Sequence, residues 1–295
     1  MKVMIYADYY GTCGVRGFLQ GPGSQFIEVS RSAKLQQLKE INSCIEGLME
    51  GGATEILVWD NDPGNPDQTP LNVYSLAGKN TMLATSRDYA GPVARVDASF
   101  DAAIHLGAYA MNHTPNAFMA HTMNAQSFDW VKLNGNFIGD LGLNILRNAY
   151  FHVPTILVSG DDKACAEAVE FNGQPLETVV TKKGLSRHKS MNYSALEICE
   201  ELREKAKKAL QNLASFKVKT LPGPYELHVK MLSQNYAGTL LQSGAEMVDD
   251  TTGILRSDDL LDMIAQLYSW APGIHAKRFH LTPETNDFFC MASLD

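Results

Sequence analysis

Short apolar strands alternate with helical segments along the first half of this 295-residue chain, and this alternation restricts its fold more than any other feature. Each strand is a brief apolar run that glycine or acidic residues soon follow. The runs are Val3–Ala7, Glu55–Trp59, Ala102–Leu106 and Thr155–Ser159. Strands and helices that alternate in this way form a sheet covered by helices. We therefore predict an α/β protein with α/β/α layers around a central mixed, largely parallel sheet.

Helix and turn signals fill the gaps between these strands. Apolar residues from Leu35 to Leu48 recur at helical spacing after Ser32, and Gly51 follows them, which predicts a helix with both ends marked. The Pro- and Gly-rich residues 63–92 predict a long loop with little regular structure. A hairpin at 130–138, helices at 140–150, 194–216 and 257–270, and strands at 225–232 and 245–248 complete the prediction.

The pattern of predicted helices and strands changes near residue 185. A long helix with a charged face, two strands and an amphipathic helix follow this point. We predict an α/β core of residues 1–185 that carries the active site. Residues 186–295 are predicted to form a smaller C-terminal α/β subdomain packed on the core.

Charge and apolar patterning exclude several classes of partner. A general nucleic-acid or anionic-membrane binder needs a basic face, and the formal net charge is −8. The apolar start of the chain is too short for a signal peptide, and no apolar run approaches the ~20 residues of a membrane helix. We predict a cytoplasmic protein that binds neither nucleic acid nor membrane, with its cysteines as free thiols.

Aspartates follow several of the predicted strands. Asp8 and Asp60 close the first two strands, and Asp161 follows a later one. The carboxyl ends of strands in an open α/β sheet meet at one edge, where ligands usually bind. Aspartate also caps helices and favours turns. We also predict a helix directly after Asp161-Asp162, so we expect that simpler role, as an N-cap, for one of these two residues.

Short motifs between residues 105 and 144 carry a resemblance to a known family. They read His105-Leu-Gly-Ala-Tyr109, Met119-Ala-His121-Thr-Met123 and Gly139-Asp140-Leu-Gly-Leu-Asn144. This frame resembles the active-site segment of the DppA-like D-aminopeptidases, a family of zinc peptidases, and the order of landmarks agrees along most of the chain. The resemblance implies peptide-bond hydrolysis and a closed homo-oligomer, such as the decamer of that family.

The resemblance also assigns roles to single positions. The family binds two zinc ions through a bridging aspartate, which Asp8 matches, and its catalytic histidine matches His121. The other family ligands are two glutamates and two histidines, and their positions are occupied here by Tyr10, Asp62, Tyr109 and Asp140. The chain is therefore identified as a divergent member in which most metal-ligand positions are substituted.

The substituted ligand set is rich in oxygen. Two carboxylates ~4 Å apart repel by roughly 4 kcal/mol at an effective dielectric near 20, so Asp8, Asp62 and Asp140 need a cation or a proton if they cluster. Oxygen donors suit Mg, Mn or Ca better than Zn. We predict one divalent ion at these aspartates, which is zinc by resemblance and Mg, Mn or Ca by ligand type. A site without metal is the alternative.

Three functions are open at this point. The first is a metal-assisted hydrolase of C–N bonds in small peptides or amides. His121 would transfer protons there, and Tyr10 and Tyr109 would line the pocket or donate to an oxyanion. The second is a non-hydrolytic member that binds a small molecule or has a structural role. The third is a metal-free amide hydrolase in which His121 works with Cys13 or Asp8.

Four further residues are candidates for binding a small peptide or amide substrate. Lys182 and Arg187 fall where the family has a lysine followed by Ser-Arg, and a cation there binds a substrate carboxylate. Asp60 ends a predicted strand, and His113 precedes the histidine motif. Each also has a simpler reading as a loop or turn residue, and Cys13 as a packed thiol.

Overall fold

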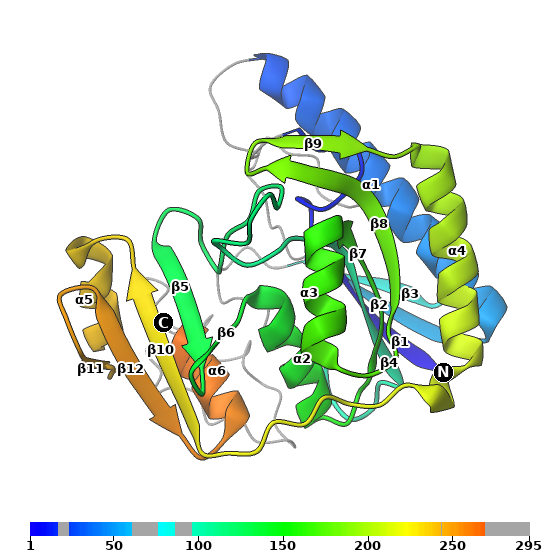
Figure 1. The fold of residues 1–295 in the computed structure, drawn as a ribbon. Helices are drawn as coiled ribbons and strands as arrows, with labels where there is room; N and C mark the ends of the chain where they lie inside the picture. The colour runs from blue at the N-terminus through cyan, green and yellow to red at the C-terminus, as the bar shows by residue number, and fades with distance from the viewer. Residues whose placement is uncertain (17–23, 61–75, 86–95, 243, 269–295) are drawn as a thin grey trace, which may run out of the picture.

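Two sheets organise the protein (Figure 1). The computed structural model describes residues 1–16, 24–60, 76–85, 96–242 and 244–268. Within these residues, no helix is both long enough and apolar enough to cross a membrane.

The larger sheet has seven strands in the order β3-β2-β1-β4-β7-β8-β9. All neighbouring strands are parallel except β8 and β9, which pair antiparallel. The strands are β1 (Lys2–Ala7), β2 (Glu55–Asp60), β3 (Thr81–Thr85), β4 (Ala102–Ala108), β7 (Thr155–Asp161), β8 (Glu177–Ser186) and β9 (Lys189–Asn192). The predicted mixed, largely parallel sheet is confirmed.

Helices cover both faces of this sheet (Figure 1). The covering helices are α1 (Ser24–Gly51), α2 (Asp140–Tyr150), α3 (Asp162–Asn172) and α4 (Ala195–Gln211). In β1, Val3 and Ile5 pack with residues of α1 and α4, whereas the Tyr6 hydroxyl reaches Asn148 of α2 on the opposite face. Burial on both faces explains why the strand reads as a continuous apolar run.

The second sheet is antiparallel, with five strands in the order β11-β12-β10-β5-β6. Its strands are β5 (Phe128–Leu133), β6 (Asn136–Phe137), β10 (Tyr225–Met231), β11 (Glu246–Met247) and β12 (Thr252–Ser257). Helices α5 (Gln234–Gln242) and α6 (Leu260–Tyr268) accompany it, and a short 3-10 turn, Leu213–Ser215, follows α4.

Helix α2 belongs to the cores of both sheets. Leu143 and Leu146 pack with strand β5 of the second sheet and with α6. Leu141 and Ile145 pack with Ala108 and other residues of the first sheet. Both faces of α2 are therefore fixed by packing, which makes it a rigid support for polar side chains near its first turn.

Several predicted boundaries differ from the structure. Helix α1 begins at Ser24 rather than Ser32. Strand β3 lies inside the stretch 63–92 that we predicted to be a loop, because parallel pairing with β2 stabilises a short segment that its Pro- and Gly-rich flanks conceal. Residues 63–75 and 86–92 of that stretch lie outside the described residues.

The predicted division at residue 185 falls inside β8, and β9 continues the same sheet beyond it. Helix α4 follows and packs along α1, while β5, from the first part of the chain, pairs with β10 in the second sheet. A division of the chain into two domains at residue 185 stays a prediction.

Candidate active site

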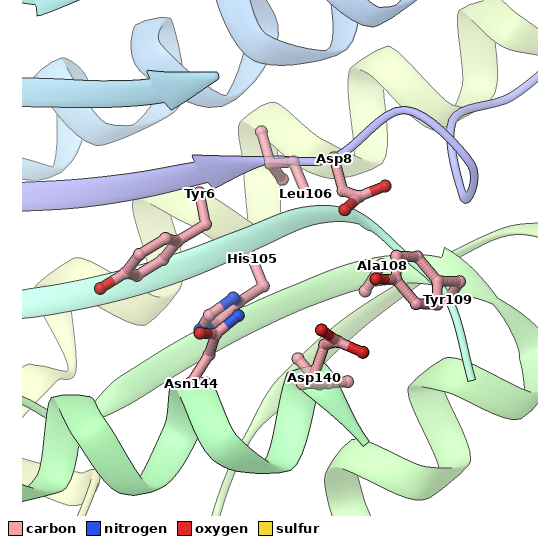
Figure 2. A pocket seen from close by; sticks show the side chains of 9 residues that line it. Tyr6, Asp8, His105, Leu106, Ala108, Tyr109, Asp140 and Asn144 are labelled. Atoms are coloured by element: carbon pink, nitrogen blue, oxygen red, sulfur yellow. The ribbon is translucent and has the colours of Figure 1, made fainter. Parts of the chain in front are cut away.

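A small pocket lies where β1 and β4 end beside the first turns of α2, with about 320 Å³ of empty space, part of it open to solvent. Figure 2 shows polar side chains from all three elements around it. Its lining residues are Tyr6, Asp8, His105, Leu106, Ala108, Tyr109, Asp140, Leu141 and Asn144. The predicted site residues Asp8, Tyr109 and Asp140 thus come together from distant parts of the sequence.

Close backbone contact between the ends of β1 and β4 fixes Asp8. Gly107 has φ +70°, and a Cβ at this position would lie 2.1 Å from the carbonyl oxygen of Asp8. The Asp8 amide donates to the Leu106 carbonyl at 2.8 Å, and Gln37 Nε2 donates to the Asp8 carbonyl at 2.9 Å. With its backbone held on both sides, Asp8 presents its carboxylate to the pocket.

Asp140 opens α2 and faces Asp8 across the pocket (Figure 2). The Met123 amide donates to its Oδ2 at 2.7 Å, and the Tyr109 hydroxyl forms a second hydrogen bond with the carboxylate. Burial raises the pKa of Asp140 to about 6 in spite of these two donors. The carboxylate is therefore costly to ionise in this environment without a compensating positive charge.

Three rings form a cluster beside the pocket. The His121 ring stacks on Tyr109 with centroids 3.8 Å apart, and Tyr10 meets both rings edge-on, at 5.1 Å from His121 and 5.7 Å from Tyr109. His121 is not among the residues that line the pocket, so it adjoins that space through Tyr109. Tyr10 and His121, two further residues of the predicted site, thus lie beside Tyr109.

The imidazole of His121 is neutral at pH 7. Its Nδ1 lies 2.7 Å from the Met119 carbonyl oxygen, which can only accept, so Nδ1 carries the proton and Nε2 the lone pair. Burial lowers the pKa of His121 to about 4; the Met119 hydrogen bond opposes this shift and the Arg187 charge adds to it. The ring is therefore available as a proton acceptor rather than as a cation.

The other end of the pocket is formed by Tyr6, His105 and Asn144. Tyr6 stacks on His105 with centroids 4.5 Å apart, and Asn148 accepts from the Tyr6 hydroxyl at 2.8 Å and donates to His105 Nε2 at 3.2 Å. Arg147 Nη2 donates to Asn144 Oδ1 at 2.6 Å. Burial, and then the Arg147 charge, lower the pKa of His105 to about 3. Our interpretation of the sequence did not include Tyr6, Asn144, Arg147 or Asn148 in the site.

Lys182 and Cys13 lie in a buried polar cluster behind Tyr10. Lys182 Nζ donates to the Tyr10 carbonyl at 3.1 Å, and burial lowers its pKa to about 8. The Cys13 thiol donates to the Tyr193 carbonyl at 3.4 Å, and burial followed by the Glu40 charge raises its pKa to about 11. Cys13 does not line the described pocket, and at neutral pH it is a thiol rather than a reactive thiolate.

The remaining candidates lie elsewhere. Asp60 is buried, with Oδ1 3.9 Å from Lys34 Nζ. His113 is exposed, and its Nε2 lies 2.5 Å from Asp129 Oδ1. Arg187 is exposed, and its carbonyl accepts from the Met119 amide at 2.9 Å, next to the loop of His121. Asp62 lies outside the described residues.

No group of three or more His, Cys, Asp or Glu side chains in the described part of the chain is arranged to hold a metal ion. Asp8 and Asp140 are the two carboxylates of the pocket lining. Glu167 lies near Asp140; it accepts from the Met111 amide at 2.9 Å, and burial, with a smaller effect of Asp140, raises its pKa to about 7.

The α/β layers carry the pocket at the strand ends, where ligands of open α/β sheets usually bind. The chain belongs to the D-aminopeptidase family, whose model matches residues 1–268. This assignment confirms the resemblance that the motifs between residues 105 and 144 indicated.

A related sequence and a solved structure, both from Bacillus subtilis, define the similarity more closely. A D-aminopeptidase of strain 168 is 28% identical over 270 residues, which span 89% of this chain and 93% of the relative. A solved structure, described as the zinc-dependent D-aminopeptidase DppA and a self-compartmentalizing protease, superposes with a TM-score of 0.80 at 27% identity. That match covers 96% of this chain and all (100%) of the solved chain.

Proposed function

We propose that this protein hydrolyses the amide or peptide C–N bond of a small substrate in the pocket between β1, β4 and α2. The observation that carries this proposal is the joint position of Asp8, Tyr109 and Asp140 at one pocket, with the neutral His121 ring stacked on Tyr109. Membership of a peptidase family supports the reaction class. A short peptide or amide is the substrate that we propose.

We further propose that Asp8 and Asp140 hold one hard divalent cation, with Asp62 as a third ligand. The pocket lining contains two carboxylates and neither lysine nor arginine, so a bound cation would offset their charge. Carboxylate oxygens suit Mg, Mn or Ca. Such an ion supplies Lewis-acid polarisation of a carbonyl or activation of water.

A pair of zinc ions fits the described residues poorly. The imidazole of the lining is His105, whose Nε2 already accepts from Asn148. His121 uses Nδ1 to bond Met119 and lies behind Tyr109. Zinc sites in proteins rely on imidazole or thiolate ligands together with carboxylates. The described pocket offers two carboxylates, two phenols, one amide and the imidazole of His105, which is already hydrogen-bonded. The zinc dependence of the Bacillus relative is therefore not transferred to this chain.

Each residue near the scissile bond has a distinct role in this proposal. His121, neutral with its proton on Nδ1, accepts a proton on Nε2 from the attacking water and then passes that proton to the leaving amine. Tyr109 orients Asp140 through its hydroxyl and holds the His121 ring by stacking. Tyr10 closes the ring cluster from the other side. Asp8 is fixed by the Gly107 contact, so the pocket geometry is preformed.

The assembly is also a proposal. The related Bacillus structure is described as a self-compartmentalizing protease, which supports a closed homo-oligomer for this chain. A decamer is the specific form that we propose. A cytoplasmic location and the absence of nucleic-acid and membrane partners stay predictions.

Product release from D- and L-dipeptides and small amides tests the hydrolase proposal. We expect turnover with at least one substrate, and a fall in kcat of about 100-fold in both His121→Ala and His121→Phe, because each removes the proton acceptor. His121→Phe keeps a ring to stack on Tyr109. Full activity in this variant would reduce His121 to a positioning role, and no turnover in the wild type would leave the non-hydrolytic alternative.

A further inference from the structure

The two ends of the pocket differ in chemistry. Asp8 and Asp140 form an acid end, while Tyr6, His105 and Asn144 form an amide end. Asp140 and Asn144 are four residues apart in α2, so they lie on one face of the helix, at a rise of about 6 Å. The function proposed above employs the acid end and leaves the amide end without a role.

The hydrogen bond from Arg147 fixes the orientation of the Asn144 amide. A guanidinium can only donate, so the atom of Asn144 that lies 2.6 Å from Arg147 Nη2 is the oxygen, Oδ1. The amino group, Nδ2, is then the remaining polar atom of a side chain that lines the pocket and is only 5% exposed. It donates no hydrogen bond to any described residue. The amide end therefore offers a donor to whatever occupies it.

Arg147 adds positive charge behind this donor. It is 2% exposed, its Nε has no hydrogen-bond partner, and its guanidinium carbon lies 5.5 Å from the centre of the Tyr6 ring. Among the described residues, no carboxylate forms an ion pair with it. A buried cation without a counter-charge is costly, and an anionic ligand at the amide end would lower that cost.

We propose that Asn144, oriented by Arg147, is a specificity-determining residue that binds a carboxylate of the substrate at the amide end. This inference rests on the proposed function and narrows its substrate class to short peptides or amides that carry a carboxylate. An ionised acceptor is preferred there over a neutral carboxamide, because the donor is fixed and the nearby charge is positive. Asn144 acts on binding, apart from the proton transfers assigned to His121.

Paired probes that differ only in this group test the proposal. The probes are D-alanyl-D-alanine and its C-terminal amide, with kcat/KM measured for each and binding followed by the shift in thermal unfolding temperature. We expect the wild type to prefer the carboxylate form by about 10-fold or more. Asn144→Asp is nearly isosteric and pairs with Arg147, but replaces the donor by an acceptor. It should therefore reverse the preference toward the amide.

Control variants separate this role from a loss of fold. Asn136→Asp makes the same chemical change at an exposed position of β6 and should leave the preference as it is. Asn144→Ala is expected to fold even if Asn144→Asp does not. It should bring the ratio of kcat/KM for the carboxylate and amide probes close to one. Three results would overturn the inference. They are an unchanged ratio of kcat/KM for the two probes in a folded Asn144 variant, a wild type that does not prefer the carboxylate probe, and a preference that is lost in Arg187→Gln instead. The binding preference could also reverse in Asn144→Asp while no variant, and not the wild type, turns over either probe. That result would support the inference about Asn144 and contradict the proposed hydrolase function.

Discussion

At the scale of single residues, burial decides the protonation of His121. The folded protein holds its pKa at about 4, whereas a histidine in the unfolded chain titrates at ~6.5. At pH values between these two pKa values, His121 is protonated in the unfolded chain and neutral in the folded protein. Stability must therefore fall as the pH drops from ~6.5 to about 4, and it is unaffected by this group above that range.

This coupling of protonation to folding predicts that the pH dependence of the free energy of unfolding differs between the wild type and His121→Gln, which lacks the titrating ring. The free energy of unfolding of the wild type should fall, relative to the variant, by about 2 to 3 kcal/mol between pH 7.5 and pH 4.5. Urea unfolding at both pH values measures it. The exposed His188→Gln is the matched control and should show no such change. A difference independent of pH would contradict the neutral, buried state of His121.

At the scale of elements, Asp161 joins the start of α3 to the loop that carries His121. Its Oδ1 accepts from the Ala164 amide and its Oδ2 from the Phe118 amide, both at 2.8 Å. Asp161→Ala removes a helix cap and a second buried hydrogen bond, so we expect a loss of about 2 to 3 kcal/mol in the free energy of unfolding. Urea denaturation measures this loss.

Asp162→Ala tests whether that effect belongs to the cap. Asp162 follows the cap, and its Oδ1 accepts from the Gly184 amide at 2.8 Å, while its Oδ2 pairs with Lys163 in partial contact with solvent. A smaller loss, of about 1 kcal/mol, is expected. Equal losses in the two variants would show that Asp161 does not stabilise α3 and its neighbouring loop in the way proposed.

Elements with strong local signals were predictable from the sequence. Helix α2 begins at Asp140 and ends at Tyr150 as predicted, the hairpin turns at Asn134-Gly135, and Asp161 caps α3. Strand β3 was not predictable, because pairing with β2 stabilises it and its own composition does not. Strands β8, β9 and β12 and helix α5 were likewise missed.

The site was predictable only in part, because some of its residues depend on contacts that the sequence does not show. The family motifs pointed to Asp8, Tyr109 and Asp140, which do meet at the pocket. The role of Asn144 depends on an amide orientation that Arg147 imposes, and nothing in the sequence shows that contact. One signal was available: Asn144 follows Asp140 by one helical turn, so the two had to share a face.

At the scale of the whole molecule, the second sheet supports the pocket without lining it. Strand β5 and helix α6 pack on one side of α2, and Ala108 of β4 and Val158 of β7 pack on the other. A movement of α2 would shift Asp140 and Asn144 together. The antiparallel sheet therefore contributes rigidity to a site whose polar groups come from the parallel sheet and α2.

A cation held between Asp8 and Asp140 should stabilise this whole arrangement, since it binds the folded protein and not the unfolded chain. Addition of Mg or Mn to chelator-treated protein is expected to raise the unfolding temperature by a few degrees. Elemental analysis before chelation should find one divalent ion per chain. Asp140→Asn should remove both the bound ion and the shift, whereas Asp250→Asn, an exposed aspartate of the second sheet's loops, should retain them. If the protein as isolated carries two zinc ions per chain, or if its unfolding temperature does not respond to any divalent ion, the single-cation site is wrong.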